Sequence, residues 1–119
     1  MRTVILESPL KGNIERNTAY AKLAMRDSLN RGEAPFASHL LYTQVLDDTI
    51  PHERDWGIEA GLALGDRLEA TVLYTDLGIT EGMQWGIERA QEAGRPIEKR
   101  SIRKEWAAWQ LSQRQKQSN

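Results

Sequence analysis

Ala70-Thr71-Val72-Leu73-Tyr74 decides the fold, because it joins β-branched and aromatic residues in an unbroken apolar run. Such a run is typical of a strand that is covered on both faces, as in a parallel sheet. Thr3-Val4-Ile5-Leu6 has the same character near the N-terminus. Two shorter segments, residues 35–37 and 96–101, complete the set of predicted strands, the last one as a polar edge strand.

Helices are predicted between these strands. The first follows the loop at residues 7–12, with Asn17 or Thr18 expected to cap its start and Gly32 expected to close it. Residues 38–43 fit neither the helical nor the strand period, and no element is predicted there. The remaining predicted helices are residues 51–65, 81–93 and 103–115.

The alternation of strands and helices at this spacing predicts parallel βαβ crossovers. We expect a three-layer α/β domain, flavodoxin-like or Rossmann-like, with about four parallel strands in the order 2-1-3-4 and helices on both faces. A chain of 119 residues fits one such unit. The domain is expected to span residues 1–102, followed by a C-terminal helix and a frayed tail in residues 103–119.

The composition excludes several classes of function. The chain has no cysteine, which removes disulfides and thiolate chemistry. Its net charge of −1 argues against binding of duplex nucleic acid. No apolar run approaches the roughly 20 residues of a membrane span, and the apolar stretch near residue 1 is too short for the pattern of a signal peptide. A cytoplasmic protein with no membrane partner is therefore expected. His39 and His52 have no acidic partners at metal-ligand spacing, and neither a metal nor a cofactor is expected.

One internal similarity concerns two helices. Trp56-Gly57-Ile58-Glu59 recurs 29 residues later as Trp85-Gly86-Ile87-Glu88, and Gly65 and Gly94 keep the same offset. A duplication would explain this similarity, and so would a common packing demand, which we favour. Under that interpretation the first glycine of each pair lets its helix approach the sheet.

Three loops are expected to form a ligand crevice, because ligands bind beyond the carboxyl ends of parallel strands. They are residues 7–12, 38–42 and 76–83. Their hydroxyls, carboxylates, histidine and helix-start amides suit a sugar or a nucleotide. The glycines at 78, 82 and 86 do not form a phosphate-loop motif, and we favour a helix face packed close to the sheet as their explanation. The candidate ligand-binding residues on these loops are Glu7, Ser8, Pro9, His39, Tyr42, Asp76, Gly78, Thr80, Gly82 and Met83.

Glu7-Ser8-Pro9, Asn17 with Tyr20, residues 35–39 and residues 75–83 together resemble a known family. It comprises small phage and bacterial proteins related to nucleoside 2-deoxyribosyltransferases, and the resemblance covers residues 2–100. It implies a flavodoxin-like fold that binds a nucleoside or a nucleotide at its strand ends. It also adds Asn17 and Tyr20 to the candidate binding residues, and gives roles at the sugar and base to Glu7, Ser8 and Asp76.

One departure from this family concerns the nucleophile. The transferases carry a nucleophilic glutamate in a pattern similar to Gly-x-x-x-Glu-x-Gly-x-Ala, and residues 82–90 place Gly86 at its position. Glu88 lies two residues further, a rotation of about 200°, so we expect it to face away from the crevice. A nucleophile must reach the anomeric carbon, so base exchange is not expected. No catalytic residue is assigned, and the candidates for a relocated carboxylate are Glu7, Glu81 and Glu88.

Three functions stay open at this point. The first is a protein that binds a nucleoside or nucleotide derivative, in a phage to sequester a signalling nucleotide of host defence. The second is an N-glycosidic-bond hydrolase or transferase with a relocated carboxylate. The third is an interaction module that docks a partner through Trp106 and Trp109, which are alternatively core residues. A homo-oligomer is expected, because four tryptophans exceed what so small a sheet needs to cover itself.

Overall fold

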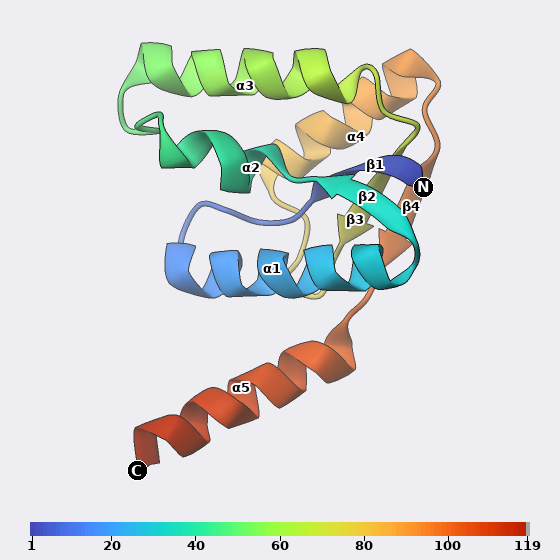
Figure 1. Cartoon of the computed structure of the whole chain (residues 1–119). Helices are drawn as coiled ribbons and strands as arrows, with labels where there is room; N and C mark the ends of the chain where they lie inside the picture. The colour runs from blue at the N-terminus through green and yellow to red at the C-terminus, as the bar shows by residue number, and fades with distance from the viewer. Residues whose placement is uncertain (119) are drawn as a thin grey trace.

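Four parallel strands form one sheet in the order β2-β1-β3-β4 in the computed structural model, which describes residues 1–118 (Figure 1). All three strand pairings are parallel. The predicted strand order and direction are confirmed, although β2 begins two residues before the predicted segment. The strands are β1 (Arg2–Glu7), β2 (Glu33–Phe36), β3 (Ala70–Tyr74) and β4 (Ile97–Arg100).

Helices cover both faces of the sheet, as the flavodoxin-like prediction requires. Figure 1 shows α1 on one side of the sheet and α3 with α4 on the other. The unassigned stretch after β2 forms a short helix and a 3-10 turn. The helices are α1 (Ile14–Asn30), α2 (Ser38–Leu41), η1 (Tyr42–Gln44), α3 (Pro51–Gly65), α4 (Glu81–Ala93) and α5 (Arg103–Ser118).

The start of α1 lies earlier than predicted. Asn13 is the cap, and its side chain accepts a hydrogen bond from a backbone N–H three residues later. Asn17 and Thr18 lie inside the helix instead. The buried Asn17 amide donates to the carbonyls of Leu10 and Lys11, at 3.0 and 2.9 Å, so it anchors the loop after β1. A cap residue and a loop anchor are both polar, so composition alone could not separate the two roles.

The main core fills the space between the sheet and α1. Every residue of β3 is buried, which confirms the interpretation of its continuous apolar run. Side chains alternate along a strand, so Val4 and Leu6 enter this core while Ile5 and Glu7 leave on the opposite face. The buried members of the core are Val4, Leu6, Tyr20, Ala24, Ala37, Ala70, Val72, Tyr74, Ile102 and Trp106.

The two similar helices use their glycines differently. A Cβ on Gly86 would lie 2.8 Å from the carboxyl carbon of Glu7, so α4 approaches the end of β1 as predicted. A Cβ on Gly57 would instead meet Leu46, at 3.3 Å, which belongs to the segment before α3. That part of the prediction is wrong. It is Gly65, at the end of α3, that meets a β1 side chain, at 2.8 Å.

α5 extends away from the α/β body, beyond α1 (Figure 1). Its buried Trp106 packs edge-on against Tyr20, with ring centroids 5.3 Å apart, and stacks on Trp109 at 5.0 Å. The helix continues to Ser118, past the predicted end, and position 119 lies outside the described residues. Within residues 1–118, no helix is long and apolar enough to cross a membrane.

A buried ion pair connects the strands at the two edges of the sheet. Arg100 at the end of β4 donates to both carboxylate oxygens of Glu33 in β2, each at 2.7 Å. The hydroxyl of Ser28 also donates to Glu33, at 2.8 Å. These hydrogen bonds lower the pKa of Glu33 to about 2, with Arg100 as the largest cause. The predicted polar edge strand therefore holds a buried arginine.

Candidate functional site

A cavity of about 670 Å³ lies beyond the carboxyl end of β1, on the face of the sheet opposite to the main core. We call it the α3–α4 cleft, because α3 and α4 form its two long walls, and α2 contributes to it beside them. β1 and β3 are the strands between which the strand order reverses, so the cleft occupies the topological switch point. The predicted site residues that line it are Glu7, Ser8, His39, Tyr42, Thr80, Glu81, Gly82, Met83 and Glu88.

Glu7 is the carboxylate in the floor of this cleft. It ends β1 and points toward α4, where its carboxyl group occupies the space beside Gly86. Burial raises the pKa of Glu7 to about 7, although the positive charge of Arg95 acts in the opposite direction. Within residues 1–118, no group donates a hydrogen bond to its carboxylate. Glu7 is therefore a carboxyl group that can take up and release a proton near neutral pH.

Ser8 and His39 form a neutral hydrogen-bonded pair beside Glu7. The Ser8 Oγ and the His39 Nε2 are 2.9 Å apart, which joins the end of β1 to the start of α2. Burial lowers the pKa of His39 to about 4, so the ring is uncharged at pH 7. A neutral imidazole has one donor and one acceptor nitrogen. The predicted contact between the first two loops is thus observed. The Ser8–His39 pair provides the cleft with polar atoms that carry no charge.

Asp76 does not join Ser8 and His39 in the cleft, which differs from the prediction. Its carboxylate accepts hydrogen bonds from the Tyr20 hydroxyl, at 2.6 Å, from the Ser101 hydroxyl, and from the Ile102 N–H, at 2.8 Å. These bonds fix the start of α5 against α1. The physical reason is that side chains alternate along β3. When this alternation is continued to position 76, it directs the Asp76 side chain to the core face.

Four further predicted residues also lie outside the cleft. Asn17 and Tyr20 are buried on the α1 side, where they hold the loop and Asp76. Pro9 is buried within the loop after β1. Gly78 has a φ of +92°, and it forms the turn between β3 and α4. These residues shape the loops around the site, and none of them is part of the cleft wall.

Glu81 and Glu88 lie on the exposed rim of the cleft. The prediction that Glu88 faces away is wrong, because the cleft extends along the flank of α4 as well as beneath it. Positions 81, 85 and 88 share one helical stripe along the side of the cleft, whereas Gly86 belongs to the stripe that faces β1. Two residues can therefore be far apart around the helix and still line the same wide cleft.

The sequence analysis missed several residues of the cleft. Trp85 provides aromatic surface in addition to that of the predicted Tyr42, and it is about half exposed, at 47%. Arg54 and Arg95 add positive charge, and no motif marks either of them. Arg95 is fixed by hydrogen bonds to the Thr71 hydroxyl, at 3.0 Å, and to a backbone carbonyl. Among residues 1–118, no three histidine, aspartate or glutamate side chains are grouped to hold a metal ion.

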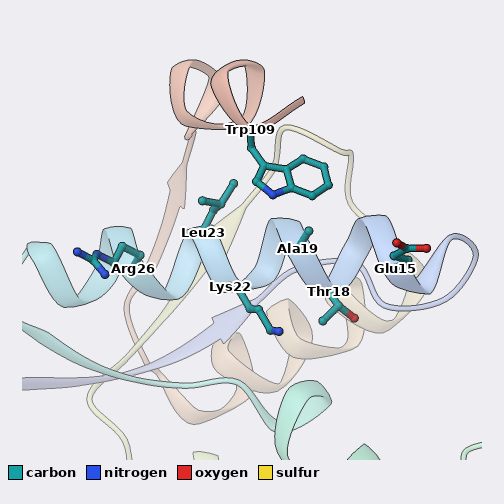
Figure 2. A pocket seen from close by; sticks show the side chains of 7 residues that line it. All are labelled: Glu15, Thr18, Ala19, Lys22, Leu23, Arg26 and Trp109. Atoms are coloured by element: carbon teal, nitrogen blue, oxygen red, sulfur yellow. The ribbon is translucent and has the colours of Figure 1, made fainter. Parts of the chain in front are cut away.

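A second hollow, of about 740 Å³, lies on the outer surface of α1 beside α5. Figure 2 shows the Trp109 ring above α1 near Ala19, with Leu23 beside it. Every lining residue is at least partly exposed, and none comes from a strand end. We therefore place the candidate functional site in the α3–α4 cleft. The residues around the second hollow are Glu15, Thr18, Ala19, Lys22, Leu23, Arg26 and Trp109.

Comparison with known proteins agrees with this architecture. No curated protein matches the chain. Among solved structures, it is similar to a 2-deoxyribosyltransferase from the psychrotolerant bacterium Bacillus psychrosaccharolyticus, described as a biocatalyst for the synthesis of antiviral and antitumoral nucleosides. The TM-score is 0.69 at 15% identity, over 83% of this chain and 72% of that chain, which shows a shared fold. The resemblance to the transferases is thus confirmed at the level of fold. A family model matches residues 2–100, and the chain belongs to the family described as a domain of unknown function, DUF7768.

Proposed function

We propose that this protein binds a nucleoside or nucleotide derivative in the α3–α4 cleft. The observation that carries the proposal is the cleft itself, where Glu7 and the Ser8–His39 pair meet at the topological switch point. A volume of about 670 Å³ lies within the range of roughly 300–1,000 Å³ that is common for small-molecule sites. The fold shared with a 2-deoxyribosyltransferase supports this ligand class.

The lining of the cleft has a group for each part of such a ligand. Tyr42 and Trp85 provide aromatic faces on which a base can stack. The Ser8–His39 pair and the Glu7 carboxyl group provide donors and acceptors for sugar hydroxyls. These groups come from β1, α2, η1 and α4, so an ordered ligand would bridge the loops around the switch point.

The positively charged side chains of the cleft permit a phosphorylated ligand as well. Lys11 and Arg54 both line the cleft, and no side-chain partner binds either of them in the described part of the chain. The N-terminus of α4 opens into the same cleft at Thr80, whose hydroxyl accepts a hydrogen bond from the Met83 N–H. Positive side chains and a helix N-terminus favour phosphate groups. The proposed ligand class therefore includes nucleotides.

The proposed biological setting rests on the resemblance. In a phage, a protein that binds nucleotides in this way would sequester a signalling nucleotide of host defence. We also propose that the chain forms a homo-oligomer, supported by exposed apolar residues on α3, among them Trp56 and Leu64. Sedimentation at micromolar concentration tests the assembly, and a mass near 13.5 kDa would contradict it.

Binding is tested by thermal shift and calorimetric titration with adenosine, cytidine, guanosine and uridine, their 2′-deoxy counterparts and the 5′-monophosphates. A compound at about fifty times its Kd should stabilise the fold by about 2 kcal/mol. Tyr42→Ala should weaken binding by about ten- to a hundredfold through lost stacking. Ser8→Ala should also weaken it, whereas Glu59→Gln, on the exposed outer side of α3, serves as the control. The proposal fails if no compound binds, or if both cleft variants bind as the unchanged protein does.

A further inference from the structure

The Glu7 carboxyl group and Gly86 compete for one position in the cleft. A Cβ on Gly86 would lie 2.8 Å from the carboxyl carbon of Glu7 and 3.0 Å from each of its oxygens. A side chain can therefore enter this position from β1 or from α4, but not from both in the present geometry. The glycine at 86 leaves the position to a carboxyl group that comes from the strand.

The carboxyl group of Glu7 is not engaged in a structural bond. No ion pair holds it within residues 1–118, although Arg95 lies near enough to influence its charge. The Arg95 guanidinium donates instead to the Thr71 hydroxyl and to the Gly65 carbonyl. The carboxylate of the buried Glu33, by contrast, is held by Arg100. A partly buried, desolvated carboxyl group that opens into a cavity without a fixed partner is suited to proton transfer.

We propose that Glu7 is the general base for hydrolysis of the N-glycosidic bond of a nucleoside or nucleotide bound in the α3–α4 cleft. This inference rests on the proposed function. Glu7 accepts a proton from a water molecule, whose oxygen lone pair forms the new bond to the anomeric carbon. The carbon–nitrogen bond breaks, and its electron pair stays on the nitrogen of the base. The proton then passes from Glu7 to that nitrogen, which leaves free base, free sugar and an ionised Glu7.

The Ser8–His39 pair fits this reaction as a group that orients the sugar. Ser8 follows Glu7 directly in the sequence, both members of the pair line the cleft, and the uncharged state of the pair leaves the proton transfer to the carboxylate. Tyr42 and Trp85 also line the cleft, both are at least partly exposed, and both are available to the base. The reacting bond would then lie between an aromatic rim and a polar floor.

The pH profile follows from the state that the reaction needs. A general base acts when it is ionised, so kcat/KM should rise with pH and level off above about 7. His39 stays uncharged over this range and should not contribute. The titratable or charged groups that line the cleft around Glu7 are Lys11, His39, Tyr42, Asp48, Arg54, Glu81, Glu88, Arg89, Glu92 and Arg95.

The experiment incubates the protein with the same nucleosides and 5′-monophosphates, follows free base by chromatography, and measures binding in parallel. We expect release of base in the unchanged protein. Glu7→Gln should lower kcat at least about a hundredfold and change Kd less than about tenfold. Glu59→Gln is the control. Gly86→Ala should also lower kcat, because its new Cβ displaces the Glu7 carboxyl group. The exchanged pair, Glu7→Gly with Gly86→Glu, returns a carboxyl group from the helix and should recover part of the activity.

Four results would overturn the inference, and they are distinguishable. Binding without release of base in the unchanged protein refutes hydrolysis and leaves the proposed function in place. Neither binding nor release refutes both. Release that persists in Glu7→Gln refutes the role of Glu7. Exchange of one base for another, tested by adding a second free base, refutes direct attack by water, because it requires an intermediate in which the sugar stays on the protein.

Discussion

Replacing Glu7 by glutamine should stabilise the protein at pH 8 much more than at pH 5. Burial raises the pKa of Glu7 from 4.5 to about 7 in the folded state. Between these values the folded protein holds a proton that the unfolded chain has released. The stability contributed by the protonated group is therefore complete below pH 4.5 and is lost as the pH rises through about 7. Glutamine is neutral at every pH and avoids this loss.

The magnitude follows from the two pKa values. A difference between 4.5 and about 7 corresponds to roughly 3 kcal/mol when it is complete. Part of this difference is already present at pH 5, so the gain from glutamine should grow by about 2–3 kcal/mol between pH 5 and pH 8. In a chain of this size, that corresponds to a rise in Tm of roughly 10 °C.

The assay is urea unfolding of the unchanged protein, Glu7→Gln and Glu59→Gln at pH 5, 6, 7 and 8. Glu59 is exposed, so its replacement should change the free energy of unfolding by less than about 0.5 kcal/mol at each pH. The reasoning is refuted if the Glu7→Gln curve runs parallel to that of the unchanged protein from pH 5 to pH 8. Parallel curves would mean that the Glu7 carboxylate is solvated or paired in the folded state.

Three further predictions concern stability. Glu33→Gln should lower the free energy of unfolding in urea by about 3–5 kcal/mol, because it breaks the buried pair with Arg100. The contribution of the pair should be complete above pH 4.5 and lost as the pH falls toward about 2. A free energy of unfolding that does not change over this pH range would contradict the prediction. Asp76→Ala should lower the free energy of unfolding by about 2–4 kcal/mol, because three hydrogen-bond donors lose their acceptor. The control Asp47→Ala, in an exposed turn, should lower it by less than about 1 kcal/mol. Equal losses would contradict the anchoring role of Asp76. Trp106→Ala should cost about 3–5 kcal/mol and remove the near-UV circular dichroism of the stacked rings, and an unchanged spectrum would argue against the observed packing of α5.

The order of the sheet and the contact between the loops after β1 and β2 were within reach of the sequence. An unbroken apolar run at residues 70–74 requires cover on both faces, and the strand–helix alternation then leaves few topologies. In such a topology, the loops after β1 and β2 must meet at the switch point. This reasoning correctly brought Ser8 and His39 together, because it depends only on connectivity and handedness.

Tertiary structure alone decided which side chains face the cleft and in what state. Alternation along β3 places Asp76 on the same side as Tyr74, but no local pattern states which face of the sheet carries the main core and which carries the cleft. The rim position of Glu88 depends on the width of the cleft, which no local pattern encodes. The contact between Glu7 and Gly86 joins two elements that are distant in the sequence. The raised pKa of Glu7 is a consequence of burial among all of its neighbours, so it exists only once the chain is folded.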